Sequence, residues 1–254
     1  MSVENIFPAF LLSLLAGLST VLGSLIAYII KKPNYNHLSI LMGFSAGVMI
    51  YVSFLELLRG SIEQIGFIYA NTGFFLGIVT IYLLDKVLPH AHIDFKMDSF
   101  HQEGAKEIGH AGMLVAIGIA LHNFPEGIAV FAVSLENLSL GIPIAIAIAI
   151  HNIPEGIAVS VPIYFATNSR KKGFLYSFFS GIAEPIGAIM GLLFLSPFLN
   201  ELTLNLTLSF VGGIMVFISF DELLPISKKY GDEHLSSISL FLGMFIMMLS
   251  LWAI

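Results

Sequence analysis

Eight apolar runs, each long enough to cross a lipid bilayer, restrict this chain more than any other feature. A membrane-spanning helix needs ~20 mostly apolar residues, and it satisfies its own backbone hydrogen bonds in lipid. Only 11% of the 254 residues are charged, against about 25% in soluble domains. The sequence therefore predicts an all-α polytopic membrane protein, with residues 1–254 forming a single transmembrane domain. The runs cover residues 5–30, 38–58, 66–88, 109–133, 139–166, 172–197, 204–226 and 235–254.

Basic residues predict the orientation of these helices. Ten of the eleven Lys and Arg residues fall on one side of the membrane if the runs cross in turn, and Arg59 is the exception. The positive-inside rule makes that side cytoplasmic, so both termini are expected outside and residues 89–108 form a cytoplasmic loop. The first run lacks the basic residues that precede a signal peptide, so we expect a retained helix. No basic patch suited to nucleic acid is present, and the expected surroundings are the lipids of a cell membrane.

A nine-residue motif occurs twice inside these apolar runs. The sequence HNFPEGIAV at residues 122–130 returns 29 residues later as HNIPEGIAV at residues 151–159. A carboxylate at the bilayer centre costs about 2.5–3.5 kcal/mol on the insertion scale. Neither run contains a Lys or Arg that would compensate Glu126 or Glu155. A bound cation is the simplest compensation.

Helical spacing places the polar residues of each motif together. At 100° per residue, Glu126 projects between His122 and Asn123, one turn further along. His151, Asn152 and Glu155 repeat this arrangement. Two such helices facing each other present one cluster of His and Glu side chains and a second of Asn and Glu side chains. The spacing thus predicts a site for two adjacent divalent cations.

Prolines and a third carboxylate strengthen this interpretation. Pro125 and Pro154 cannot donate to the carbonyls four residues earlier, so we expect both helices to kink at the motif. Glu184, followed by Pro185 in the sixth run, brings the carboxylates to three. The chain has no Cys, which excludes thiolate ligands. Imidazole and carboxylate suit Zn(II), Fe(II), Mn(II) or Co(II), whereas Ca(II) and Mg(II) prefer oxygen ligands alone.

A second, weaker repeat links the second and seventh runs. Seven residues between Gly47 and Leu58 match residues between Gly213 and Leu224 at one constant offset. These two helices cross the membrane in opposite directions, as do the two helices that carry the nine-residue motif. Inverted pairs of this kind are typical of transporters built from inverted repeats.

Other polar residues have less specific interpretations. Glu56, Asp221 and Glu222 lie near helix ends and are candidate ligands at the entrance and exit of a metal path, although such carboxylates commonly reach solvent. The predicted loop is either a weak metal-collecting segment or a solvated connection. It contains His90, His92, His101, Asp94, Asp98 and Glu103. Interhelical hydrogen bonding is the alternative role of the duplicated polar residues.

Four motifs resemble those of the ZIP family of metal-ion transporters. They are His-Asn-x-Pro-Glu-Gly at residues 122–127 and again at 151–156, Ala-Glu-Pro at 183–185, and Asp-Glu-Leu-Leu-Pro at 221–225. The resemblance covers essentially all eight helices. It implies a 3+2+3 helix arrangement with inverted repeats, a metal site between the fourth and fifth helices, metal uptake into the cytoplasm and a homodimer.

The resemblance also implies roles for individual residues. When the ligand residues of the family are matched by position, the resemblance implies that a primary metal is held by His122, Glu126, His151 and Glu155. It implies that a neighbouring metal is held by Asn123, Asn152, Glu184 and the shared glutamates. The fifth helix lacks the His-Glu-x-Pro-His-Glu form seen in another branch of the family, so zinc selectivity is not implied. The expected substrates are Zn(II), Fe(II), Mn(II), Co(II) and Cd(II).

Two other classes of function compete with a transporter. A zinc protease needs His-Glu-x-x-His, and di-iron bundles use Glu-x-x-His, whereas both motifs here read His-x-x-x-Glu. An intramembrane metalloenzyme is therefore the weaker alternative, and we expect no enzymatic activity. A metal-selective channel is harder to exclude from the sequence.

Overall fold

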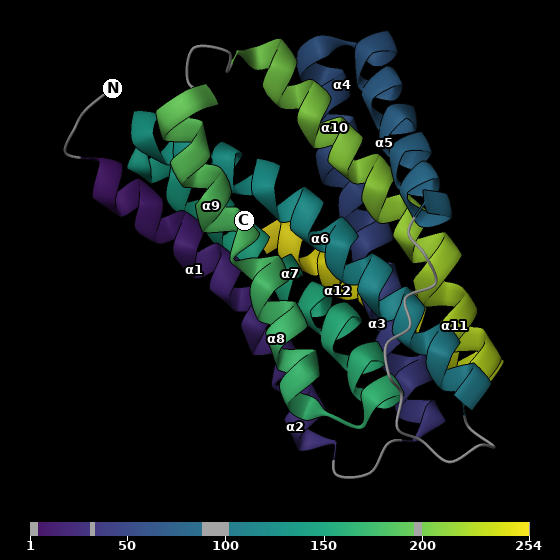
Figure 1. Ribbon diagram of the computed structural model, residues 1–254. Coiled ribbons are helices and arrows are strands. Elements are labelled where there is room, and N and C mark those ends of the chain that lie inside the picture. The colour runs from purple at the N-terminus through teal and green to yellow at the C-terminus, as the bar shows by residue number, and fades with distance from the viewer. Residues whose placement is uncertain (1–4, 31–33, 88–101, 196–199, 254) are drawn as a thin grey trace.

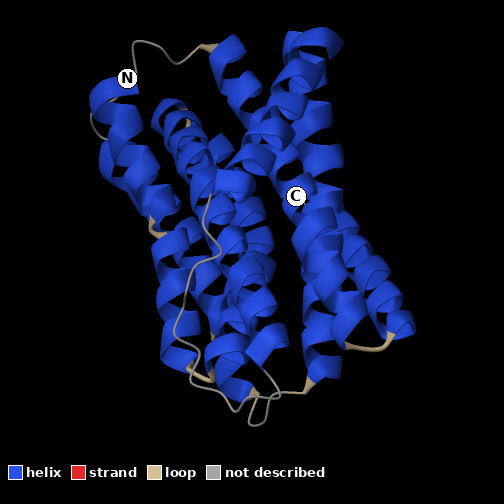
Figure 2. Ribbon diagram, turned by 45° about the vertical axis from the view of Figure 1, so that its right-hand side comes forward, coloured by secondary structure: helices blue, strands red, loops and turns tan. Residues whose placement is uncertain are grey.

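The residues that the structure describes are almost entirely helical, with short connections and no strand among them (Figure 2). This computed structural model describes residues 5–30, 34–87, 102–195 and 200–253. Eight helical spans within these ranges are long and apolar enough to cross a membrane, which confirms the predicted all-α membrane fold. In chain order, the spans are α1 (Ile6–Ser24) with α2 (Ile26–Ile29); α3 (Tyr35–Val52), η2 (Ser53–Leu58) and α4 (Arg59–Ile65); α5 (Phe67–Val87); α6 (Gln102–Glu136); α7 (Leu138–Thr167); α8 (Arg170–Gly181), α9 (Ala183–Met190) and η3 (Gly191–Leu195); α10 (Glu201–Ile218), η4 (Ser219–Leu223) and α11 (Leu224–Tyr230); and α12 (Glu233–Ala253).

The fourth span begins earlier than the sequence predicts. Helix α6 starts at Gln102, so the predicted loop at 89–108 is wrong over its last seven positions. These positions carry Ala, Glu, Gln and Lys, which favour helix even where apolar residues are few. Hydrogen bonds from α11 also stabilise this end of the helix, because Glu107 accepts from Lys229 Nζ (2.5 Å) and from the Tyr230 hydroxyl (2.9 Å). Residues 88–101, with His90, His92, Asp94, Asp98 and His101, lie outside the described part of the chain.

The helices form two groups that meet along α6 and α7. Helices α1 and α8 pack against both α6 and α7, and α9 packs against α6, whereas α3 packs with α12 and α5 packs with α10. Helix α7 also contacts α3, and α6 contacts α10. In Figure 1, α1, α8 and α9 lie to the left, and α4, α5 and α10 lie to the right. The two helices that carry the repeated motif are therefore enclosed by neighbours on both sides.

The second and seventh spans have the same local structure, as their sequence repeat predicts. Each is interrupted by a short π-helix, η2 in one and η4 in the other. Each π-helix begins at a serine that bonds the carbonyl four residues earlier: Ser53 to Met49 (2.6 Å) and Ser219 to Met215 (2.8 Å). Glycines make close backbone crossings at equivalent places in the α3–α12 and α10–α5 pairs. The equivalent residues are Phe44, Gly47, Phe74 and Gly77 in one repeat, and Phe210, Gly213, Leu240 and Gly243 in the other.

Candidate metal centre

Seven polar side chains meet at the centre of the helix bundle. They come from α6, α7 and α9, and each is at most 1% exposed. All lie within spans that are long and apolar enough to cross the membrane. The structure thus brings together all seven residues of the predicted central site: His122, Asn123, Glu126, His151, Asn152, Glu155 and Glu184.

The imidazoles and two of the carboxylates contact one another between α6 and α7. His122 Nε2 lies 2.8 Å from Glu155 Oε1 on the facing helix and 3.6 Å from Glu126 Oε2 on its own helix. His151 Nε2 lies 3.4 Å from Glu126 Oε1. Glu126 therefore lies between the two histidines.

The two asparagines lie beside this group and donate hydrogen bonds to different neighbouring helices. Asn152 Nδ2 donates to the Ala16 carbonyl (3.0 Å) and to Glu184 Oε2 (2.9 Å). Asn123 Nδ2 donates to the Ser180 carbonyl (3.0 Å). Their amide nitrogens are thus satisfied by α1, α8 and α9, which leaves the amide oxygens for other partners.

The remaining polar atoms of the cluster lack satisfactory hydrogen bonds. Burying such a group without a partner costs about 1–3 kcal/mol, and more for a charge. Nitrogen and oxygen acceptors of this kind are also the atoms that ligate divalent transition metals. The imidazole–carboxylate contacts above are ion-pair contacts without hydrogen-bond geometry. The atoms without a hydrogen bond are therefore both ring nitrogens of His122 and His151, both carboxylate oxygens of Glu126 and Glu155, Oδ1 of Asn123 and Asn152, and Glu184 Oε1.

The cluster is closed as it stands. Its histidines and glutamates are in direct contact, and no three His, Asp or Glu side chains in the described ranges are spaced to hold an ion between them. A divalent ion has ligand distances of about 2.0–2.2 Å to nitrogen and oxygen. An ion at this place therefore requires small movements that part the imidazoles from the carboxylates.

Each motif also contains the glycine that brings the surrounding helices close. A Cβ atom on Gly127 would collide with the Glu184 backbone of α9, and one on Gly156 would collide with the Thr20 backbone of α1. Helices α6 and α7 continue through Pro125 and Pro154, and the kinks expected there remain a prediction. The Pro-Glu-Gly sequence thus combines a ligand-type carboxylate with a close helix crossing one residue later.

Glu56 lies nearer to this cluster than its position in the sequence suggests. The π-helix η2 carries it, and it is close enough to His151 and Glu126 to interact electrostatically. Its Oε2 atom is buried without a hydrogen bond, although the residue as a whole is only half-buried, so both expectations for this carboxylate, a ligand on the metal path or a group that reaches solvent, stay open. Its equivalent in the repeat, Glu222 on η4, instead faces an acidic group that includes Asp221 and Asp85.

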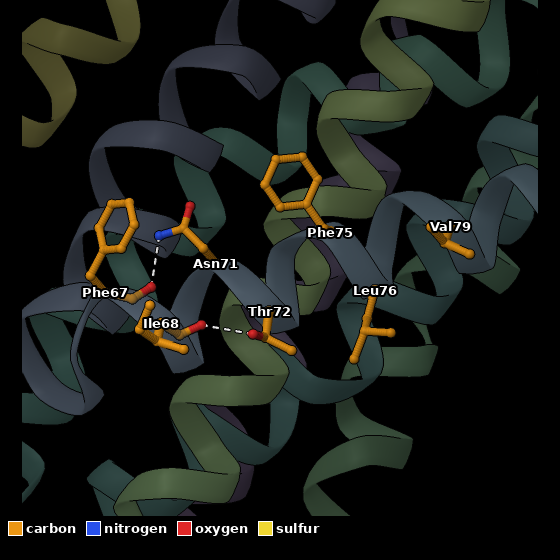
Figure 3. Close-up of a pocket in the computed structure, with 7 residues that line it drawn as sticks. All are labelled: Phe67, Ile68, Asn71, Thr72, Phe75, Leu76 and Val79. Carbon is orange, nitrogen blue, oxygen red and sulfur yellow. Dashed lines mark hydrogen bonds between the residues drawn. The ribbon is translucent and has the colours of Figure 1, made fainter.

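A surface pocket on α5 is unrelated to the cluster. Phe67, Phe75, Leu76 and Val79 line it, together with polar residues that bond their own helix (Figure 3). Asn71 Nδ2 donates to the Phe67 carbonyl, and the Thr72 hydroxyl donates to the Ile68 carbonyl, both at 2.8 Å. With its polar groups satisfied internally, this face suits contact with lipid.

The fold and the cluster together define a polytopic membrane protein with a buried histidine–carboxylate centre between two related helices. The family model described as ZIP Zinc transporter matches residues 85–251, and the chain belongs to the ZIP family. The zinc transporter ZupT of Clostridium perfringens is 48% identical over 98% of this chain and 97% of its own length. ZupT of Streptococcus mutans is 48% identical over 98% of both chains, and ZupT of Campylobacter jejuni is 46% identical over 98% of this chain and 97% of its own.

Proposed function

We propose that this protein carries Zn(II) and related divalent metal ions across a cell membrane through the cluster between α6 and α7. The observation that carries this proposal is the set of fully buried imidazole, carboxylate and amide atoms that lack hydrogen bonds. Divalent cations bound there would take several of these atoms as ligands and offset the charge of the three buried carboxylates. Membership of the ZIP family and similarity to proteins named zinc transporters support zinc as one substrate.

The proposed site holds two neighbouring ions. His122, Glu126, His151 and Glu155 form the primary position. The second position is formed by Glu184, the amide oxygens of Asn123 and Asn152, and the shared glutamates. Asn152 and Glu184 already lie together, because Asn152 Nδ2 donates to Glu184 Oε2 at 2.9 Å. Nitrogen and oxygen ligands without sulfur also accept Fe(II), Mn(II), Co(II) and Cd(II), so we propose all of these as substrates.

The proposed direction of transport is into the cytoplasm. It follows from the resemblance to the ZIP family. The distribution of basic residues predicts that both termini lie outside, which puts the end of the second span, with Glu56, toward the outer side. Glu222 and Asp221 on η4 then mark the path of release. Helices α1, α6, α7, α8 and α9 contribute side chains or backbone to the cluster, and we propose that they move against the other helices to expose it alternately. We further propose a homodimer.

Radiolabelled zinc uptake into proteoliposomes tests this function. A carrier saturates, because each ion waits for a conformational change, whereas flux through a channel keeps rising with the gradient. We expect uptake above that of protein-free vesicles, with saturation and competition by Mn(II) and Fe(II). Absent uptake contradicts the proposal, and uptake that does not saturate supports the channel alternative.

Glu56→Gln tests the path on the outer side. Removing this charge weakens the attraction of cations toward His151 and Glu126, so we expect the KM for zinc to rise about 3–10-fold, with a smaller change in maximal rate. Glu63→Gln on the same span is the control, because Glu63 is exposed and paired with Arg59 at 2.9 Å. Equal kinetics in both variants would remove Glu56 from the path.

A further inference from the structure

The helix crossings on the two sides of the metal centre follow one pattern. On one side, Gly127 of α6 meets the backbone of α9 at Glu184. On the other, Gly156 of α7 meets the backbone of α1 at Thr20. Because Gly127 and Gly156 are equivalent in the nine-residue repeat, Thr20 occupies the place on α1 that Glu184 occupies on α9. The reciprocal contacts agree, with Gly187 against Phe124 on one side and Gly23 against Ile153 on the other.

The asparagine side chains obey the same correspondence. Asn152 donates to the Ala16 carbonyl on α1, and Asn123 donates to the Ser180 carbonyl on α8, each at 3.0 Å. Each acceptor carbonyl lies one helical turn before the equivalent residue named above. The two amides therefore take the same position relative to their neighbouring helices, and this correspondence predicts that Asn123 faces Thr20 as Asn152 faces Glu184.

The two sides differ in the second hydrogen bond of the asparagine amide. Asn152 Nδ2 makes a second hydrogen bond, to Glu184 Oε2 at 2.9 Å. Thr20 is 0% exposed, yet neither its Oγ1 atom nor Oδ1 of Asn123 has a hydrogen-bond partner. A buried helical hydroxyl commonly bonds a carbonyl of its own helix, as Ser24 of α1 does with Val21 at 2.6 Å. Thr20 forgoes that bond although burial without one is costly.

We propose that Thr20 is a positioning residue of the second metal position, where it orients the Asn123 carboxamide toward the bound divalent cation. The inference rests on the proposed function of the cluster. With an ion present, Asn123 Nδ2 donates its second hydrogen to Thr20 Oγ1, directly or through one water, and the amide oxygen is held toward the metal. A neutral hydroxyl opposite the Glu184 carboxylate also makes the site unequal in charge, so the second ion lies nearer to Glu184.

Thr20→Val and Thr20→Ser separate the hydroxyl from the shape of the side chain. Valine keeps the shape and removes the hydroxyl, so we expect the KM for zinc to rise up to about 10-fold, as for loss of one hydrogen bond, with a smaller change in maximal rate. Serine should keep nearly wild-type kinetics. Ser24→Ala is the matched control on α1, because its hydroxyl bonds only its own helix. Thr20→Ala replaces the valine variant if valine disturbs the contact with Gly181.

Equilibrium dialysis against labelled zinc adds a readout that a packing defect does not move. We expect wild-type protein to bind two ions and Thr20→Val to bind the second one more weakly. In Asn123→Ala protein, adding Thr20→Val should have little further effect, because the two residues act as one unit. Wild-type kinetics and binding in Thr20→Val, or a serine variant as impaired as valine, overturns the role of Thr20. Failure of the wild-type protein to take up zinc overturns the proposed function, and this inference with it.

Discussion

Glu126→Ala and Glu155→Ala should each reduce zinc uptake into proteoliposomes at least about 100-fold. Each change removes a carboxylate that lies against an imidazole of the facing helix, with Glu155 Oε1 2.8 Å from His122 Nε2 and Glu126 Oε1 3.4 Å from His151 Nε2. An uncompensated buried charge costs about 3–5 kcal/mol, and 3 kcal/mol already weakens binding of the ion more than a hundredfold when its carboxylate is removed. Glu126→Gln keeps the shape of the side chain and should fail in the same way, since charge is what the metal requires.

The matched control is Glu63→Ala, because the Glu63 side chain is 59% exposed and pairs with Arg59 outside the cluster. It should leave uptake unchanged. Zinc should also raise the unfolding temperature of the wild-type protein, because a ligand that binds only the folded state stabilises it, and it should not do so for the two site variants. Saturable, wild-type uptake by both variants would remove the cluster as the transport site.

Gly127→Val should destabilise the protein and abolish uptake even though it changes no polar group. The new side chain would collide with the backbone of α9 at Glu184, which cannot rotate away as a side chain can. Overpacking of a closely packed site costs about 1–3 kcal/mol or more. We therefore expect the unfolding midpoint in detergent to fall by at least about 5 °C.

Gly60→Ala controls for the general effect of replacing a helical glycine. A Cβ atom at Gly60 meets no neighbour within 4 Å. Alanine is favoured over glycine inside a helix by about 1 kcal/mol, so this variant should be as stable as the wild type or slightly more so, with normal uptake. A Gly127→Val protein as stable as Gly60→Ala would contradict the close crossing of α6 and α9.

Strong periodic signals made much of the fold and of the site predictable. The eight apolar runs become eight spans, and the ends differ by only a few residues except in two places: the second span continues through α4 to Ile65, and helix-favouring polar residues extend α6 to Gln102. The spacing of His122, Asn123 and Glu126 places them on one face, because a helix repeats every 3.6 residues. The nearly identical motif in the next helix then predicts that both faces meet, as the structure shows.

What the sequence did not reveal depends on contacts between distant segments. Glu56, on a π-helix, lies within electrostatic range of His151, and its distance along the sequence from the motif does not predict that proximity. Thr20 and Glu184 share no chemistry, so their equivalence emerges only from the crossings of α1 with α7 and of α9 with α6. Small residues at such crossings allow two helices to approach closely, but a glycine in the sequence does not indicate which helix will pack against it.

Anomalous diffraction at the zinc absorption edge, from crystals grown with zinc, tests the central claim most directly. We expect a zinc peak between α6 and α7, about 2.0–2.2 Å from nitrogen or oxygen atoms of His122, His151, Glu126 and Glu155, with the present contacts between imidazoles and carboxylates opened around it. Zinc bound only elsewhere, for example at Asp221 and Glu222, with the central side chains still in contact, would contradict the account.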